Sequence, residues 1–90
     1  MTCKEYLEEP DFSYTTFFVI AQGDLSARDF CKVTGIGSTY LVSKTRSGET
    51  PIPSLKTVKR LAAYTNVSAR ELWLKVCNEF FDKKDNIILH

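Results

Sequence analysis

The segment from Leu25 to Thr45 constrains the fold of this chain more than any other part of it. Ser26 is of the residue type that caps helix N-termini, and Gly35 can adopt the left-handed conformation that ends a helix. An apolar rhythm starts again at Ile36. The spacing therefore predicts two short helices that cross at close range around a tight turn, the layout of a helix-turn-helix motif.

The inward-facing positions of this helix pair follow when Ala27 is taken as the first residue of the helix-turn-helix motif. Four side chains are expected to face inward: Phe30, Cys31, Ile36 and Leu41.

The chain has three cysteines, an odd number with wide spacing, which predicts neither a disulfide framework nor a zinc site. Cys31 and Cys77 are therefore expected to be plain core residues.

A chain of 90 residues with 43% hydrophobic residues has room for one domain with a modest core. Its longest apolar run, residues 17–21, is too short for a membrane span of about 20 residues, and no basic start leads into a cleavable signal. The expected location is therefore cytoplasmic, with no membrane partner. The single histidine is His90, and neither a metal nor a cofactor is expected.

The net charge is only +1, but the charges are unevenly distributed. Residues 1–24 carry one basic and five acidic side chains, whereas residues 25–60 carry seven basic and two acidic ones. The basic surplus coincides with the predicted helix pair, where contacts to nucleic-acid phosphates would be needed. A solvated basic face without a partner is the alternative interpretation.

Two helices are predicted before this motif. A short acidic helix is expected over Thr2–Glu9, ending before Pro10, and a second from a cap at Asp11 or Ser13 to about Gln22. The apolar face of the second consists of Tyr14, Phe17, Phe18 and Ala21. Because residues 14–20 are rich in aromatic and β-branched types, a strand stays open as the alternative.

Two more helices are predicted after the motif. Ser54 caps one, which ends at Asn66, and its apolar side consists of Leu55, Val58, Leu61 and Ala62. Ser68 caps the other, with Glu71 three positions later. The apolar face of this last helix consists of Ala69, Leu72, Trp73, Val76, Cys77 and Phe80. Its length and continuity predict the best-buried helix of the domain.

The chain ends on three apolar residues, Ile87, Ile88 and Leu89, after a charged stretch. Burial of such side chains on a partner contributes about 1.5 to 3 kcal/mol each before ordering costs. A terminal arm that pairs with a second copy is therefore one hypothesis. The other is that these residues pack on their own domain.

The sequence resembles the lambda-repressor-like, or Cro-like, helix-turn-helix family of DNA-binding regulators, also called the xenobiotic-response-element family. The resemblance covers about Phe12 to Leu72. It rests on TGIGSTYL at 34–41, Arg46, PSLKTVKRLA at 53–62 and NVSARELW at 66–73. It implies an all-α, compact bundle of about five helices, with a supporting helix over 26–34 and a recognition helix from 37 to about 45. The expected organisation is an acidic segment at 1–11, the helix-turn-helix domain at 12–85 and an apolar C-terminal tail at 86–90.

By position, the resemblance implies which residues contact DNA. The major-groove set is Gly37, Ser38, Thr39, Val42 and Ser43. Hydroxyl groups can bond base edges or phosphates, and a valine can touch a thymine methyl group. Phosphate contacts are expected from Arg28, Lys44, Arg46 and Lys56, and from the free amides of the helix that begins at Ser26.

Several positions depart from the usual family pattern, and among them Thr34 and Thr65 replace common leucines. Lys44 stands where the family buries an aliphatic residue, and Thr45 replaces an acidic residue. The arginine that pairs with this acid in the family is also missing from the first helix of the domain. Loss of only one buried charge partner is strongly destabilising, so the loss of both indicates that another interaction has replaced the ion pair.

These observations predict a transcriptional regulator, a repressor of the phage or mobile-element type, that binds a palindromic operator in double-stranded DNA as a homodimer. The alternative is a protein-interaction module, such as an antirepressor or co-regulator, that keeps the fold and binds a protein partner. The low net charge and the acidic residues 1–24 favour this alternative. An enzyme is not expected, because general acid–base chemistry needs positioned histidines or paired carboxylates.

Overall fold

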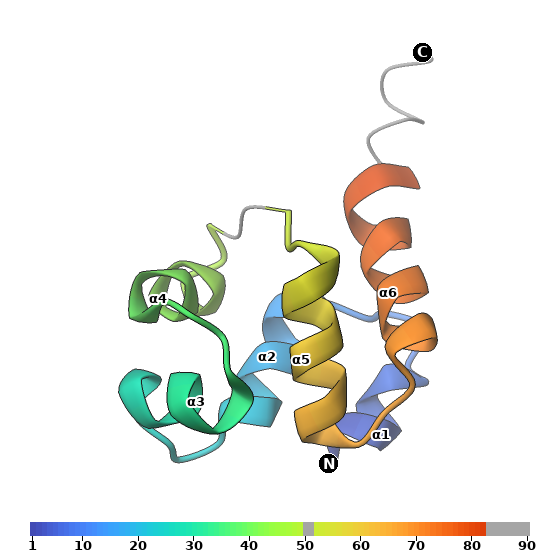
Figure 1. The fold of residues 1–90 in the computed structure, drawn as a ribbon. Coiled ribbons are helices and arrows are strands. Elements are labelled where there is room, and N and C mark those ends of the chain that lie inside the picture. The colour runs from blue at the N-terminus through green and yellow to red at the C-terminus, as the bar shows by residue number, and fades with distance from the viewer. Residues whose placement is uncertain (50–51, 83–90) are drawn as a thin grey trace.

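The computed structural model describes residues 1–49 and 52–82, which form six α-helices and a π-helical turn. The elements, shown in Figure 1, are α1 (Cys3–Leu7), α2 (Tyr14–Gln22), α3 (Ala27–Thr34), α4 (Thr39–Arg46), α5 (Leu55–Thr65), α6 (Ala69–Cys77) and the π-helical η1 (Asn78–Asp82). The described residues contain no strand, so the predicted all-α class is confirmed. The predicted tail at 86–90 lies outside the described residues.

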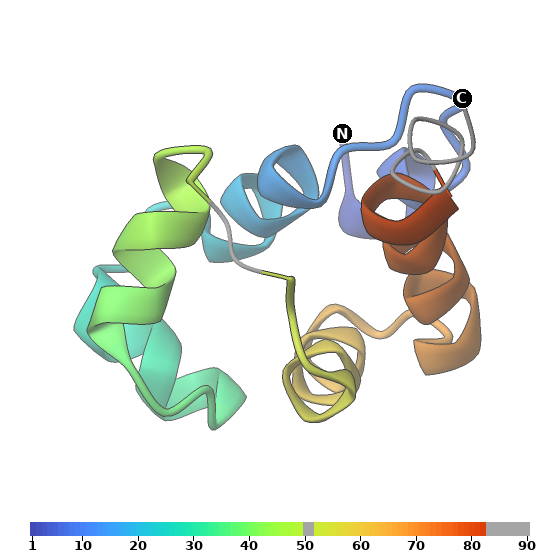
Figure 2. The same cartoon turned by 90° about the horizontal axis from the view of Figure 1, so that it is seen from above.

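The helices are arranged along a molecule of 43 × 26 × 20 Å. In both Figure 1 and Figure 2, α3 and α4 lie at one end and α6 at the other, with α2 and α5 between them. The N-terminal α1 packs against α2 and α6. The α3–α4 pair therefore lies at the opposite end from the C-terminal helix.

The second helix supplies the largest part of the core. Tyr14, Phe17 and Phe18 are fully buried, as the helical spacing predicts. The Phe18 ring meets Phe30 of α3 edge-on, with centroids 5.2 Å apart. The alternative of a strand over 14–20 is wrong, because a strand would send Phe17 and Phe18 to opposite faces, whereas here both are in the core.

Every α-helix begins after a hydroxyl residue. In each case the cap hydroxyl accepts a hydrogen bond from the backbone N–H three residues later, and the caps are Thr2, Ser13, Ser26, Ser38, Ser54 and Ser68. The predicted stops are also found, since Gly35 and Asn66 have left-handed backbone with φ of 79° and 58°. Local sequence chemistry thus sets most helix ends.

The last helix is less buried than its apolar face predicts. Leu72 and Val76 of α6 are fully buried, but Trp73, Cys77 and Phe80 are only partly covered. The prediction that this helix is the best buried is therefore wrong, because α6 lies at one end of the molecule, whereas α2 lies between the two ends (Figure 2) and buries more side chains. Leu55, in the first turn of α5, is 43% exposed, so its predicted place on the apolar side of that helix is wrong.

The first eleven residues share the core of the rest of the chain. Cys3 and Leu7 belong to the same buried cluster as the residues of α2 and α6. The Tyr6 hydroxyl accepts a hydrogen bond from the backbone N–H of Ser13, at 2.9 Å. The acidic segment predicted at 1–11 thus packs as part of the bundle.

Candidate nucleic-acid interface

The segment predicted as a helix-turn-helix forms α3, a tight turn and α4, and the two helices pack against each other. In the turn, the buried Thr34 hydroxyl donates to the Phe30 carbonyl at 2.7 Å and accepts from the Ile36 N–H at 3.1 Å. Phe30 and Ile36 are buried, as predicted. Cys31 and Leu41 are only partly buried, but both pack against the core, so all four residues face inward as predicted.

The fourth helix begins two residues later than predicted. Gly37 and Ser38 precede it, and Ser38 is the N-cap, with extended backbone at φ −146° and ψ 123°. The Ser38 hydroxyl accepts from the Leu41 N–H at 3.3 Å. Gly37 and Ser38 are exposed at the N-terminal end of α4 rather than inside the helix.

Val42 does not face solvent, and its prediction as a groove-facing residue is wrong. Its exposed fraction is 0%, and Thr45 on the same side of α4 is 1% exposed. The buried Thr45 hydroxyl donates a hydrogen bond to the Leu41 carbonyl at 2.8 Å. Burying Lys44 instead would remove a charge from water without compensation. The helix is therefore rotated so that Val42 and Thr45 face the core.

This rotation leaves a polar exposed face on α4. The exposed residues of the helix and its cap are Ser38, Thr39, Tyr40, Ser43 and Arg46. Tyr40, which is 69% exposed, was missed by the sequence prediction. Because consecutive residues of a helix are about 100° apart, Tyr40 lies on nearly the opposite side from Val42. The charge of Lys44 was the available signal, since it fixes which side of α4 can be buried.

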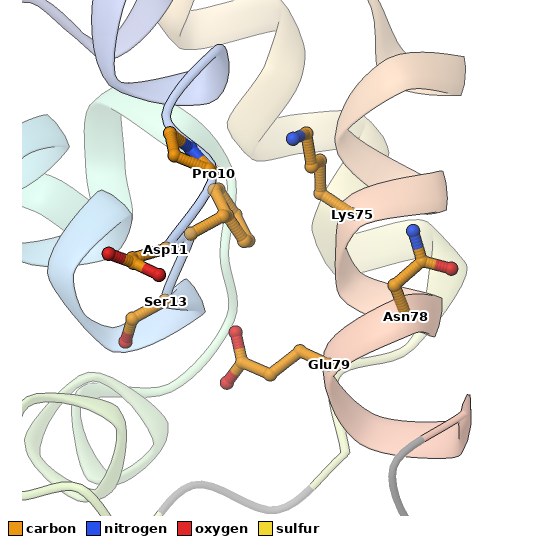
Figure 3. A pocket seen from close by; sticks show the side chains of 7 residues that line it. Pro10, Asp11, Ser13, Lys75, Asn78 and Glu79 are labelled. Atoms are coloured by element: carbon orange, nitrogen blue, oxygen red, sulfur yellow. The ribbon is translucent and has the colours of Figure 1, made fainter.

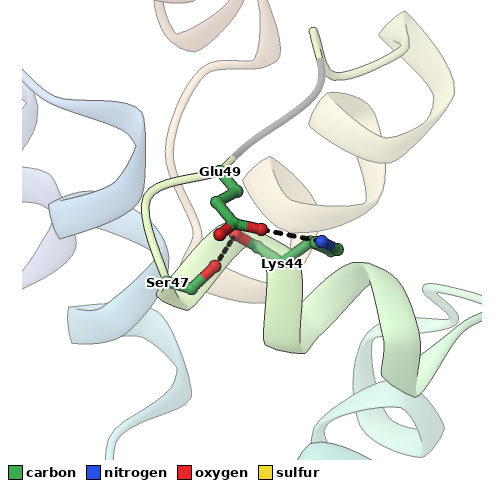
Figure 4. Close-up of polar contacts among 3 residues, drawn as sticks. All are labelled: Lys44, Ser47 and Glu49. Atoms are coloured by element: carbon green, nitrogen blue, oxygen red, sulfur yellow. Dashed lines mark hydrogen bonds and ion pairs between the residues drawn. The ribbon is translucent and has the colours of Figure 1, made fainter.

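Lys44 is partly covered and has two partners. Its Nζ atom lies 2.7 Å from a carboxylate oxygen of Glu49 and 5.6 Å from the centroid of the Tyr40 ring. Figure 4 shows Glu49 reaching back from the segment after α4, beside Ser47, whose hydroxyl donates to the Lys44 carbonyl. The charge predicted to contact phosphate is therefore paired with an acid of the same chain.

The other predicted phosphate contacts come from three helices. Ser26 is the exposed cap of α3, and its hydroxyl accepts from the Asp29 N–H at 3.1 Å. Arg28 is exposed in the first turn of α3, which packs on α4, and Arg46 is exposed at the end of α4. Lys56 is exposed on α5, whose main neighbours are α3 and α6. Arg28 and Arg46 therefore belong to the packed α3–α4 pair, and Lys56 belongs to a separate helix.

A concave region of about 570 Å³ lies away from α4, between residues 10–13 and the end of α6 with the start of η1. Figure 3 shows the side chain of Glu79 extending across it toward Ser13 and Asp11. The Glu79 carboxylate accepts a hydrogen bond from the Tyr14 N–H at 2.7 Å, so it caps the start of α2. This concave region contains none of the predicted site residues. The Glu79 carboxylate that extends across it is already bonded to the Tyr14 N–H.

Comparisons with protein-family models, curated proteins and solved structures found no match to this chain. Among residues 1–49 and 52–82, no helix has the length and apolar character needed to cross a membrane. Within the same ranges, no group of three or more His, Cys, Asp or Glu side chains is arranged to hold a metal ion.

Proposed function

We propose that this protein is a sequence-specific DNA-binding regulator, a repressor of the phage or mobile-element type, that binds a palindromic operator as a homodimer. The observation that carries the proposal is the exposed face of α4. This face presents hydroxyl groups and a tyrosine, while Val42 and Thr45 hold the helix on the core. A helix held in this way can enter a major groove without losing its own packing.

The proposed division of labour follows from the chemistry of the exposed groups. Thr39, Tyr40 and Ser43 contact base edges through hydroxyl groups, and the Tyr40 ring offers apolar surface to a thymine methyl group. Arg28 and Arg46 contact phosphates of the DNA backbone next to the groove that α4 enters. Because the hydroxyl groups replace the strong bidentate contact of arginine with guanine, phosphate contacts and DNA shape carry much of the affinity.

Charge reversal tests this proposal. We expect Arg28→Glu and Arg46→Glu each to lower affinity for duplex DNA by about tenfold or more, and to reduce the dependence of log K on log salt by about one. The measurement is fluorescence anisotropy with a labelled duplex at several salt concentrations.

Arg70→Glu is the matched control, because Arg70 is exposed on α6, at the other end of the molecule, and its reversal changes the net charge equally. Equal losses for all three variants would mean that only net charge matters. No binding by the unaltered protein would contradict the proposal directly.

The second candidate function is a protein-interaction module. It is favoured by the exposed apolar residues Leu74 and Phe81, which are 54% and 40% exposed and seven positions apart along α6 and η1. Exposed apolar side chains of this size are often covered by a protein partner. Under this alternative, Leu74→Lys abolishes function while Arg46→Glu leaves it unchanged.

A further inference from the structure

Arg60 joins α5 to the turn between α3 and α4. Its Nη1 atom donates a hydrogen bond to the carbonyl oxygen of Gly35, which is 25 residues away in the chain. Its Cδ and Nε atoms lie 3.7 Å from the position that a Cβ atom on Gly35 would occupy. The guanidinium group therefore lies directly over the turn.

This contact is chemically suited to the end of a helix. The last carbonyl groups of a helix lack partners within it, and they form the negative end of the helix dipole. Gly35 is the left-handed residue that follows α3, and its N–H donates to the Cys31 carbonyl. A cationic donor at the Gly35 carbonyl makes a charge-assisted hydrogen bond, which is stronger than a bond between neutral groups.

The other hydrogen bonds of the turn are local. They are made by Thr34 and Gly35 to residues of α3 and to Ile36. Arg60 reaches the turn from α5, where the two residues directly after it, Leu61 and Ala62, are buried and anchor the helix in the core. It therefore relates the turn, and the start of α4, to the centre of the bundle.

We infer that Arg60 is a positioning residue, which fixes the angle at which α4 leaves the turn and so the placement of its exposed face on DNA. This inference rests on the proposed function. An eight-residue helix is about 12 Å long, so a tilt of about 10° at its start moves its far end by about 2 Å. Recognition requires side chains to be held within about 0.5 Å. Loss of the Arg60 contact therefore impairs sequence recognition more than general attraction to phosphates.

The first test compares Arg60→Ala with Arg60→Lys and with Lys59→Ala, a neighbouring exposed cation on α5. Affinities are measured by anisotropy for a selected operator and for a random duplex, at several salt concentrations. We expect Arg60→Ala to lower operator affinity about tenfold, while its random-duplex affinity changes by no more than that of Lys59→Ala and its salt dependence stays unchanged. Arg60→Lys keeps the charge but loses the planar guanidinium group with its several N–H donors. We expect it to recover only part of the operator affinity. Lys59→Ala changes both affinities by the same factor.

Equal losses on both duplexes for Arg60→Ala, with salt dependence reduced by about one, would identify Arg60 as a phosphate ligand and overturn the inference.

The second test needs no DNA. Amide hydrogen exchange of Gly35 and Ile36 is followed by NMR in the same variants, with Leu72 of α6 as the internal reference. We expect exchange of both turn amides to accelerate at least threefold in Arg60→Ala and to stay unchanged in Lys59→Ala. Unchanged exchange in Arg60→Ala overturns the positioning role. Faster exchange combined with no DNA binding by the unaltered protein overturns the proposed function, and with it the role in recognition.

Discussion

Lys44, which the sequence predicts to contact phosphate, is paired with an acid of its own chain. The Lys44–Glu49 pair is open to water, with side chains 35% and 66% exposed. Pairs of this kind contribute little to stability, typically below about 1 kcal/mol. The consequence of the pair is therefore expected in binding rather than in folding.

We expect Glu49→Gln to raise affinity for duplex DNA several-fold at low salt, because Lys44 no longer has a competing carboxylate. The gain shrinks as salt increases, since screening weakens both interactions. Anisotropy titrations at several salt concentrations measure this. Glu71→Gln, an equal charge change at an exposed position of α6, is the control. An equal gain in that variant would show that the Lys44 pairing has no specific effect.

Tyr14 makes the stability sensitive to high pH. Burial raises the pKa of its phenol above the usual value of about 10. The folded state therefore holds this proton more tightly than the unfolded state. The contribution of Tyr14 is complete below pH of about 10 and is lost as pH rises further, at no more than about 1.4 kcal/mol per pH unit.

We expect Tyr14→Phe to flatten the decrease of unfolding free energy above pH of about 10, as measured by urea denaturation followed by circular dichroism. Tyr40→Phe is the control, because Tyr40 is exposed. An unchanged slope in Tyr14→Phe would contradict the assigned burial of the phenol.

The register of α4 is the feature on which the interface depends most. Val42 is buried and Ser43, its neighbour, is exposed. We expect Val42→Ala to lower the free energy of unfolding by about 2 kcal/mol through loss of buried methyl groups, and Ser43→Ala to change it by less than about 0.5 kcal/mol. Urea denaturation measures both. The reverse order would mean that α4 presents the opposite face to solvent.

The helices themselves were predictable because their signals are local. Each cap hydroxyl lies three residues from the amide that it accepts from, and the left-handed stops at Gly35 and Asn66 are chosen by residue type. The rotation of α4 was not predicted. Val42 and Thr45 are buried in the structure, whereas the resemblance assigned Val42 to the DNA groove.

Contacts between distant segments also had no local signal. Glu79 accepts from the Tyr14 N–H across 65 residues, and Arg60 donates to the Gly35 carbonyl across 25. Neither pairing produces a periodicity or a spacing that can be read along the chain. Such contacts became visible only when the folded chain brought the segments together.

At the scale of the whole molecule, the two ends carry different surfaces. The α3–α4 end carries exposed hydroxyl groups, the cations Arg28 and Arg46 and the exposed Val33, whereas the α6 end carries the exposed Leu74 and Phe81. This separation allows one end to bind DNA while the other meets a second copy or another protein. It also makes the proposal testable without knowledge of the operator.

The most direct test is selection of binding sites from random-sequence duplex DNA with the purified protein, followed by sequencing and by affinity measurements up to about 0.2 M salt. We predict enrichment of a palindromic site, with half-sites about one helical turn apart and an affinity that falls steeply with salt. No enrichment, together with weak binding even at low salt, would contradict the proposal of an operator-binding regulator and favour the protein-interaction alternative.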